Sequence, residues 1–306
     1  MAQALPLHER PLSALALRLY TECPLRFRRR YVDGLYLAGL PDDPAERRAL
    51  LQGERFHLMA RRAFSGLEPG TLGDPADRAE LMGWMDMLRR YLPRRPGYAY
   101  YPELELRLAE RGAAGASLPV LRLVAKFDLL VVAPDGQATI YDWKTLRYMP
   151  PRARLETAFQ TTVYRYVLCA AGGAYAPGGA FDPDRVAMVY WNPLKGGREE
   201  RLPYSAAQFA EDGRRLRQLV AQILATPPDG FLPTGDRRIC SRCEYNPLCH
   251  GPLSEWAAEV QMGVDGPVEG DSVAGAVEEE LVDEEPVEEE QAPDGGGDDP
   301  ADLPLP

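Results

Sequence analysis

The sequence predicts an α/β protein with a mixed central sheet, and three patterns support this. Residues 98–108 alternate as a strand does, with Leu104, Leu106 and Leu108 on one side and charged residues on the other. Segments with helical periodicity precede and follow this region. A further strand-like run at 185–191 comes after a helical segment. A chain that passes from hairpin to helix to strand to helix is typical of a mixed sheet flanked by helices.

Helices are expected first along the chain. Two short ones are predicted over residues 12–32, with Ser13 as the N-cap of the first and Cys23-Pro24 as the break between them. Residues 44–66 form an amphipathic helix whose apolar face carries Leu50, Leu51, Phe56, Met59, Ala60 and Phe64. Another helix is predicted over 76–92.

The central strands follow. After the strand at 98–108, a long strand is predicted over 120–132, then a hairpin turn at Asp135-Gly136 and a returning strand over 138–143. Single helices are predicted over 152–169 and over 205–225, the second ending before Pro227-Pro228.

Charge divides the chain into two parts. The net charge is -11, yet residues 261–306 hold 16 acidic side chains and no Lys or Arg. Residues 1–260 therefore carry 35 basic and 30 acidic side chains, a balance compatible with a polyanionic ligand. Because residues 261–306 lack periodicity and are rich in Glu, Asp, Pro and Gly, they are expected to be disordered.

Membrane and secretion signals are not evident. No apolar run approaches the roughly 20 residues of a membrane helix. The first ten residues show neither the apolar core nor the cleavage site of a signal peptide. The expected location is the cytoplasm, with no membrane partner.

Two carboxylates interrupt or end apolar strands. Asp128 lies within a hydrophobic run, and Asp142 lies near the end of the returning strand. In a hairpin the two are neighbours, and Lys144 shares the face of Asp142 because strands have period two. Two carboxylates can hold Mg²⁺, and a nearby lysine can orient water or stabilise developing charge. Taken singly, Asp128 could also be a strand-end cap, and Asp-x-Lys is common by chance.

These residues, in this order, resemble the PD-(D/E)XK nuclease superfamily, and Asp142-Trp143-Lys144-Thr145 resembles its RecB-type subgroup. The resemblance implies a restriction-endonuclease-like core with Asp128 and Asp142 as metal ligands and Lys144 as the catalytic lysine. It also implies the Trp143 carbonyl as a ligand. The family often has glycine where this chain has Ala125.

Other motifs extend the resemblance. Gln160-Thr161-Thr162-Val163-Tyr164 is similar to the subgroup's Gln-x-x-x-Tyr element, which implies that Gln160 and Tyr164 lie near the substrate. Gly53-Glu54-Arg55-Phe56-His57 is similar to its Gly-x-x-x-His helix, which implies His57 as a metal ligand, although a lone histidine is more often a core residue. Glu103 or Glu105 corresponds to an upstream acidic residue, and the sequence does not decide between them.

Four of the five cysteines form a pattern. Cys240, Cys243 and Cys249 are closely spaced, and Cys23 lies far upstream, which favours a metal or cluster site over disulfides. The pattern resembles that of iron–sulfur RecB-type nucleases, including the AddB nuclease domain and CRISPR-associated exonucleases. That resemblance implies a 4Fe-4S cluster joining the two ends of the domain. Zinc is the alternative occupant, and Cys169 is expected to be a plain buried residue.

The expected function is a Mg²⁺- or Mn²⁺-dependent deoxyribonuclease that acts on DNA ends or single strands, in repair, recombination or CRISPR adaptation. One nuclease domain is expected over 1–260, with a helical region at 36–97 and the acidic tail after it. No phosphate-binding loop is present, so any helicase or adaptation protein would be a separate partner. One alternative is a catalytically silent module that binds nucleic acid or a partner. Another is a different metal hydrolase that uses the same carboxylates, but the chain has only three histidines, and this disfavours it.

Overall fold

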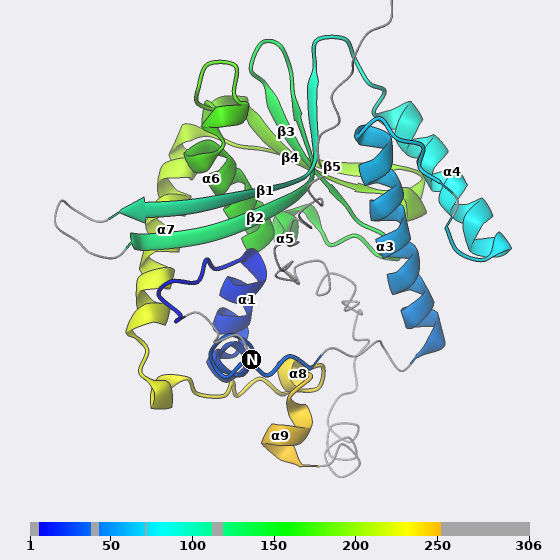
Figure 1. Ribbon diagram of the computed structural model, residues 1–306. Coiled ribbons are helices and arrows are strands. Elements are labelled where there is room, and N and C mark those ends of the chain that lie inside the picture. Colours follow the sequence, from blue (N-terminus) through cyan, green and yellow to red (C-terminus); the bar gives the residue numbers. More distant parts are fainter. Residues whose placement is uncertain (1–5, 38–42, 71, 112–118, 252–306) are drawn as a thin grey trace, which may run out of the picture.

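A five-stranded sheet forms the centre of the computed structural model, which describes residues 6–37, 43–70, 72–111 and 119–251 (Figure 1). Its order is β1-β2-β3-β4-β5, with β3 and β4 parallel and every other neighbouring pair antiparallel. The expected mixed α/β sheet is confirmed, with an edge strand, β5, that the sequence patterns did not indicate. The strands are β1 Ala99–Arg111, β2 Pro119–Val132, β3 Ala138–Trp143, β4 Val186–Asn192 and β5 Arg198–Pro203. The acidic segment 261–306 lies outside the described residues, so the expectation that it is disordered stays a prediction.

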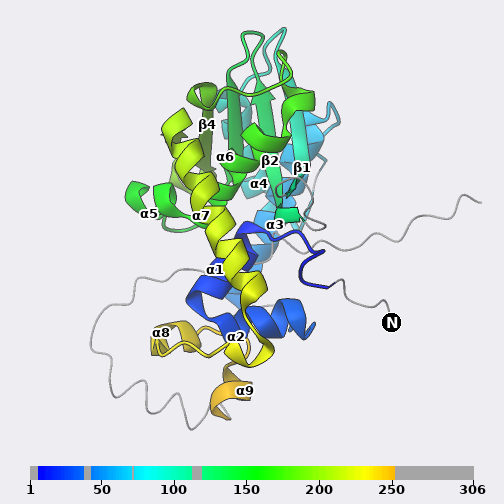
Figure 2. The ribbon, with the colours of Figure 1, turned by 90° about the vertical axis from the view of Figure 1, so that its left-hand side faces the viewer.

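Helices cover both faces of the sheet (Figures 1 and 2). One face packs on a large core shared with α1, α6 and α7, and the other on a smaller core shared with α3 and α4. The helices are α1 Ala14–Glu22, α2 Pro24–Phe27, α3 Pro44–Phe64, α4 Pro75–Tyr91, α5 Arg152–Thr157, α6 Phe159–Ala171, α7 Ala206–Ala225, α8 Arg237–Cys240 and α9 Asn246–His250. Within the described segments, no helix is long and apolar enough to cross a membrane.

Several local signals act as expected. The Ser13 side chain accepts a hydrogen bond from the Ala16 amide and caps α1. Pro24 begins α2, where its missing N–H is not needed. In the turn between β2 and β3, Gly136 takes a φ of 87°, a left-handed conformation that glycine adopts without strain.

The single helix expected over 152–169 is wrong, because the chain forms α5 and α6 with a break at Ala158. Ala158 is extended (ψ 140°) and ends α5. The buried Thr161 hydroxyl donates to the Leu155 carbonyl at 2.6 Å and shares a 2.7 Å hydrogen bond with the Tyr190 hydroxyl of β4. These bonds satisfy polar groups at the break and attach the start of α6 to the sheet.

The hairpin of β1 and β2 changes its alternation part-way. In β2, Phe127 and Leu130 both face the larger core, while Leu129 faces the smaller one. In β1, Tyr101 and Leu104 likewise both pack on the larger core. Side chains two apart normally share a face, so each strand shifts by one residue at this point. The shift lies at Glu103 and Asp128, next to Leu129, where the pairing of β2 with β3 ends. Beyond the other strands, the hairpin of β1 and β2 sweeps away from the sheet (Figure 1).

The core beneath α3 and α4 is rich in aromatic rings. Phe56 of α3 is fully buried, stacks on Trp191 at 6.0 Å and meets Trp84 edge-on at 5.7 Å. The next residue along α3 is His57, whose ring lies edge-on to Phe56 at 6.3 Å. Packing of Phe56 therefore fixes both the depth and the rotation of α3 against the sheet.

We expect Phe56→Ala to destabilise the fold by about 3–5 kcal/mol, because it leaves a cavity under three aromatic rings. Phe56→Leu, which keeps most of the volume, should lower stability by less than about 1.5 kcal/mol. Urea unfolding followed by circular dichroism measures both changes. A loss below about 1 kcal/mol in the alanine variant would show that α3 is held elsewhere.

Candidate functional site

His57 brings three of the sequence-predicted site residues together. Its Nδ1 lies 3.2 Å from Asp128 Oδ1, and its Nε2 lies 3.0 Å from the Trp143 carbonyl oxygen. Both partners are acceptors, so whichever ring nitrogen carries a proton can donate to the atom that it faces. The Trp143 amide donates to Asp128 Oδ2 at 2.6 Å. The end of β3 thus holds the carboxylate from one side while α3 holds it from the other.

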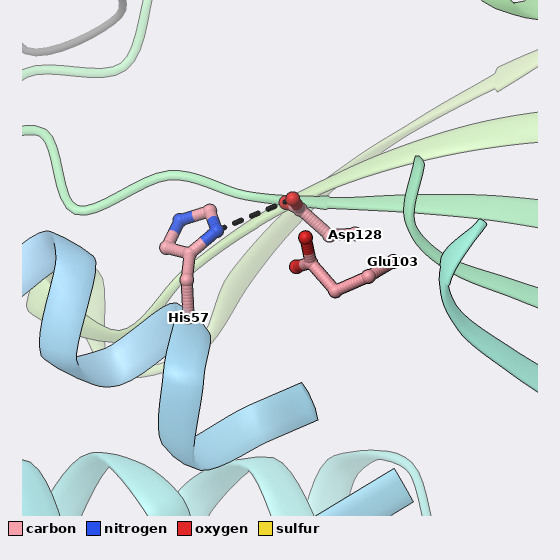
Figure 3. A group of neighbouring side chains, drawn as sticks. All are labelled: His57, Glu103 and Asp128. Atoms are coloured by element: carbon pink, nitrogen blue, oxygen red, sulfur yellow. Dashed lines mark hydrogen bonds and ion pairs between the residues drawn. The ribbon is translucent and has the colours of Figure 1, made fainter. Parts of the chain in front are cut away.

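Glu103 completes this cluster (Figure 3). One ligand atom each from His57, Glu103 and Asp128 lie within 4.8 Å of one another. Glu103 has a φ of 53°, which is unusual for a residue with a side chain and costs roughly 1–2 kcal/mol. Its carboxylate forms an ion pair with Lys126 at 2.8 Å. Glu105, the other acidic residue considered above, instead pairs with Arg107 at 2.6 Å.

A second cluster lies around Asp142. The Asp142 side chain is almost fully buried and forms an ion pair with Lys144 at 2.7 Å. Gln160 bridges the pair, donating to Asp142 Oδ1 at 2.6 Å and accepting from Lys144 Nζ at 3.2 Å. Lys144 Nζ also lies 5.6 Å from the centre of the Tyr190 ring. Burial, and then the Asp142 charge, raise the pKa of Tyr190, so its hydroxyl stays protonated.

The backbone of Trp143 joins the two clusters. The pair Leu129 and Tyr141 is in register across β2 and β3, which places Asp128 and Asp142 one step further along the same two strands. Between Asp142 and Lys144, the Trp143 peptide groups contact both His57 and Asp128. Asp128, Asp142 and Lys144 therefore lie near one another, as the sequence predicted. Their roles as ligands and catalyst stay predictions.

A cavity of about 240 Å³ opens over the first cluster. His57, Glu103, Lys126 and Asp128 line it, and Tyr164 of α6 and Arg61 of α3 contribute to its wall. Asp142, Lys144 and Gln160 are not among its lining residues. Gln160 and Tyr164, one turn apart on α6, thus divide their tasks: Gln160 bonds to the buried pair and Tyr164 faces the cavity.

The donor set fits a hard divalent cation. Two carboxylates, an imidazole and a backbone carbonyl supply oxygen and nitrogen atoms at the convergence of α3, β1, β2 and β3. Mg²⁺ and Mn²⁺ prefer oxygen-rich sets of this kind. The strained backbone at Glu103 aims its carboxylate at the others, and strain of this kind is concentrated at functional sites.

Comparison with known families decides the class of protein. A family model described as the PD-(D/E)XK nuclease superfamily matches residues 11–250. The chain belongs to that superfamily. No curated protein matches the chain. The subgroup within the superfamily stays a prediction.

Two solved structures are similar to this nuclease chain. A candidate exonuclease from Eubacterium rectale shares 12% identity, with 84% of this chain and 95% of that chain covered and a TM-score of 0.46. The protein SSO0001 shares 13% identity, with 79% and 86% covered and a TM-score of 0.38.

The four predicted cluster cysteines line one small pocket at the other end of the nuclease. Cys23 lies at the junction of α1 and α2, while Cys240, Cys243 and Cys249 come from the segment containing α8 and α9. Burial, followed by the neighbouring Cys23 and Cys249, raises the pKa of Cys240. Among the described residues, no three of these sulfurs lie within 4.8 Å of one another.

Protein contacts already join the two ends of the domain around this pocket. Arg26 forms an ion pair with Glu244 at 2.6 Å, and the Arg29 guanidinium lies over the Tyr245 ring at 5.8 Å. The Leu25 amide donates to the Leu232 carbonyl at 3.1 Å. Cys169, by contrast, lies on α6 beside the large core, and burial raises the pKa of its thiol to about 12. Its expected role as a plain packing residue agrees with this position.

The sequence patterns did not indicate Lys126 and gave no physical reason for Gly53. Lys126 lies two residues before Asp128, and period two would have placed it on the same face, but no motif singled it out. Gly53 lies on α3 where a Cβ atom would come within 2.7 Å of Thr145 Oγ1. The Gly-x-x-x-His pattern indicated this glycine, but only the structure gives its reason, which is close approach of α3 to the residue after Lys144.

We expect Gly53→Ala and Gly83→Ala to differ in stability by roughly 1 kcal/mol or more. Both glycines are inside helices, where alanine is favoured by about 1 kcal/mol. Gly83 has open space around its Cβ position, so its variant should gain most of that value. The Gly53 variant must displace the Thr145 side chain, so we expect no gain in stability. Equal stabilisation in urea unfolding would show that Thr145 moves aside freely.

Proposed function

We propose that this chain is a Mg²⁺- or Mn²⁺-dependent deoxyribonuclease that hydrolyses phosphodiester bonds at DNA ends or in single strands. The observation that carries the proposal is the convergence of His57, Glu103, Asp128 and the Trp143 carbonyl next to the Asp142–Lys144–Gln160 cluster. Membership of a nuclease superfamily supports the class of reaction.

His57, Asp128 and the Trp143 carbonyl would hold the cation, with Glu103 and Asp142 as the remaining carboxylates. When bound, such a cation supplies Lewis acidity toward a phosphodiester. Lys144 presents a fixed ammonium beside this position, because Asp142 and Gln160 restrain it from two sides. An ammonium held there stabilises charge that develops on the phosphate and orders a water for attack. Tyr164 and Arg61, which line the cavity, would contact the substrate strand.

The proposed biological setting is DNA repair, recombination or CRISPR adaptation, with any helicase or adaptation protein as a separate partner. Clusters of arginine near residues 26–30, 61–62 and 89–95 support a polyanionic substrate. End-labelled single- and double-stranded DNA and RNA, incubated with Mg²⁺, Mn²⁺ or EDTA, would define the substrate and polarity.

We expect Asp128→Asn, Asp142→Asn and Lys144→Met each to lower cleavage of end-labelled DNA by at least about 100-fold, because each removes a charge at the reacting phosphate. Isothermal titration with Mn²⁺ should show weaker binding for Asp128→Asn. Lys144→Met should bind Mn²⁺ as the parent does, because Lys144 is proposed to orient water and stabilise charge on the phosphate and is not a metal ligand.

Glu103→Gln and Glu105→Gln form a matched pair of variants. The first should weaken Mn²⁺ binding and cleavage, while the second should match the parent, because Glu105 pairs with Arg107 instead. Cleavage that survives Asp142→Asn would contradict the site. DNA binding without cleavage under any metal would favour the silent binding module.

The four-cysteine pocket is proposed to hold a 4Fe-4S cluster. Thiolates are the usual ligands of such clusters. A tetrahedral zinc site with bonds near 2.3 Å would require sulfurs roughly 3.8 Å apart, and no three of these thiols lie within 4.8 Å of one another among the described residues. The thiols would therefore have to move together to hold zinc, whereas the cysteine pattern resembles that of iron–sulfur nucleases. Burial raises the pKa of Cys243 to about 11, so binding of a cluster or a metal ion must displace protons from the thiols.

We expect anaerobically purified protein to contain about four iron and four sulfide per chain. Cys243→Ser should lose most of this iron and lower the melting temperature, because the pocket joins the two ends of the domain. Cys169→Ser, which changes a cysteine outside the pocket, should keep the iron. One zinc per chain with no iron would reverse the assignment.

A further inference from the structure

A second cavity of about 310 Å³ lies on the face of the sheet that α3 and α4 partly cover. Tyrosine rings and guanidinium groups dominate its wall, contributed by the end of α4, the start of β1, and strands β2, β3 and β5. None of its lining residues belongs to the cavity around His57. Its principal members are Tyr91, Arg95, Tyr98, Tyr141, Glu199 and Arg201.

Tyr141 contributes a hydroxyl group to the wall of this cavity. The residue is 8% exposed, and one face of its ring stacks on Trp143 at 5.6 Å. Its hydroxyl makes no hydrogen bond to any of the described residues, and the residue lines the cavity, so the group is available to a ligand. A tyrosine hydroxyl is an O–H donor at neutral pH, so Tyr141 can donate to a group in the cavity.

Two arginines share the cavity wall with Tyr141. They are Arg201 of β5 and Arg95. Arg95 is held in place, since its amide donates to Tyr100 at 2.8 Å and its guanidinium lies 5.7 Å from the Tyr98 ring centre. Arg201 is exposed, and its guanidinium forms no ion pair within the described segments. Two cations and one neutral donor around a cavity are the groups that bind a phosphate.

The rest of the wall suits a sugar or base. Glu199 accepts a hydrogen bond from Tyr91, and its other lone pairs can accept from hydroxyl or amino groups. The Tyr98 ring, half-buried beside Arg95, offers an aromatic surface for a base. The cavity therefore combines anion, polar and stacking contacts.

We propose that this second cavity binds a nucleoside phosphate, either within a nucleic-acid strand or as a free mononucleotide. The lining residue Val131 lies on β2 three positions beyond Asp128, roughly 10 Å away, and Ala133 lies just after the end of β2. A strand in the His57 cavity could therefore reach the second cavity within a few nucleotides. That the nucleoside phosphate can belong to a nucleic-acid strand rests on the proposed nuclease function.

The experiment measures binding by the full chain in EDTA, so that no cleavage occurs. Deoxythymidine monophosphate is titrated by calorimetry, and fluorescein-labelled dT15 by anisotropy. The variants are Tyr141→Phe, which removes only the hydroxyl, and Arg201→Gln, which is exposed and leaves the core intact. Arg214→Gln, on α7 and exposed, is the control for the loss of one positive charge. Melting temperatures confirm that all variants are folded.

Tyr141→Phe and Arg201→Gln are each expected to weaken binding at least 5-fold, as for the loss of a hydrogen bond to a charged group. Arg214→Gln should change it less than 2-fold. Weaker binding of the mononucleotide supports a free-nucleotide site, and weaker binding of dT15 alone supports a strand site. Both probes binding the two cavity variants as tightly as the control would overturn the proposal.

Cleavage by the unaltered protein separates this proposal from the nuclease function. If the protein cleaves DNA but the cavity variants keep normal affinity and KM, the inference fails and the function stands. If the cavity variants lose affinity but no metal supports cleavage, the nuclease function fails and the binding site stands.

Discussion

The one-residue shift in the β1–β2 hairpin is the constraint on which the candidate site depends. Regular alternation would send Asp128 into one of the two apolar cores, where an unpaired carboxylate is costly. The shift instead occurs at Asp128 and Glu103, so both carboxylates turn toward α3. Residues on either side stay buried, since Phe127 and Leu130 remain in the larger core. Packing along the whole hairpin thus offsets the strained backbone of Glu103.

The two side-chain clusters come from different layers of the protein. His57 approaches from α3, on the side of the aromatic core, whereas Gln160 approaches from α6, on the side of the larger core. Asp142 and Lys144 lie at the end of β3 between them. Each layer has its own anchor: Phe56 positions α3, and Thr161 with Tyr190 positions α6. A change in either core would therefore move one half of the site relative to the other.

Strong local patterns allowed much of this arrangement to be predicted from the sequence. The alternation of Leu104, Leu106 and Leu108, the Asp135-Gly136 turn and the Ser13 cap are encoded within a few residues, and they appear as expected. The break at Ala158 was not predicted, because α5 and α6 carry continuous helical periodicity and the bonds of Thr161 to Leu155 and Tyr190 form only in the folded chain. The choice of Glu103 over Glu105 depends on a positive φ that no sequence pattern reveals.

Trp143 contributes to the candidate site through its main chain, while its indole is buried among Phe64, Tyr141 and Trp191. Its amide holds Asp128, and its carbonyl contacts His57. Replacing the side chain at this position leaves both peptide groups in place and alters the site only by repacking the aromatic core. Alanine scanning would therefore record position 143 as a stability residue. Ester substitution of the backbone, by nonsense suppression or chemical ligation, would be needed to reveal what its peptide groups contribute.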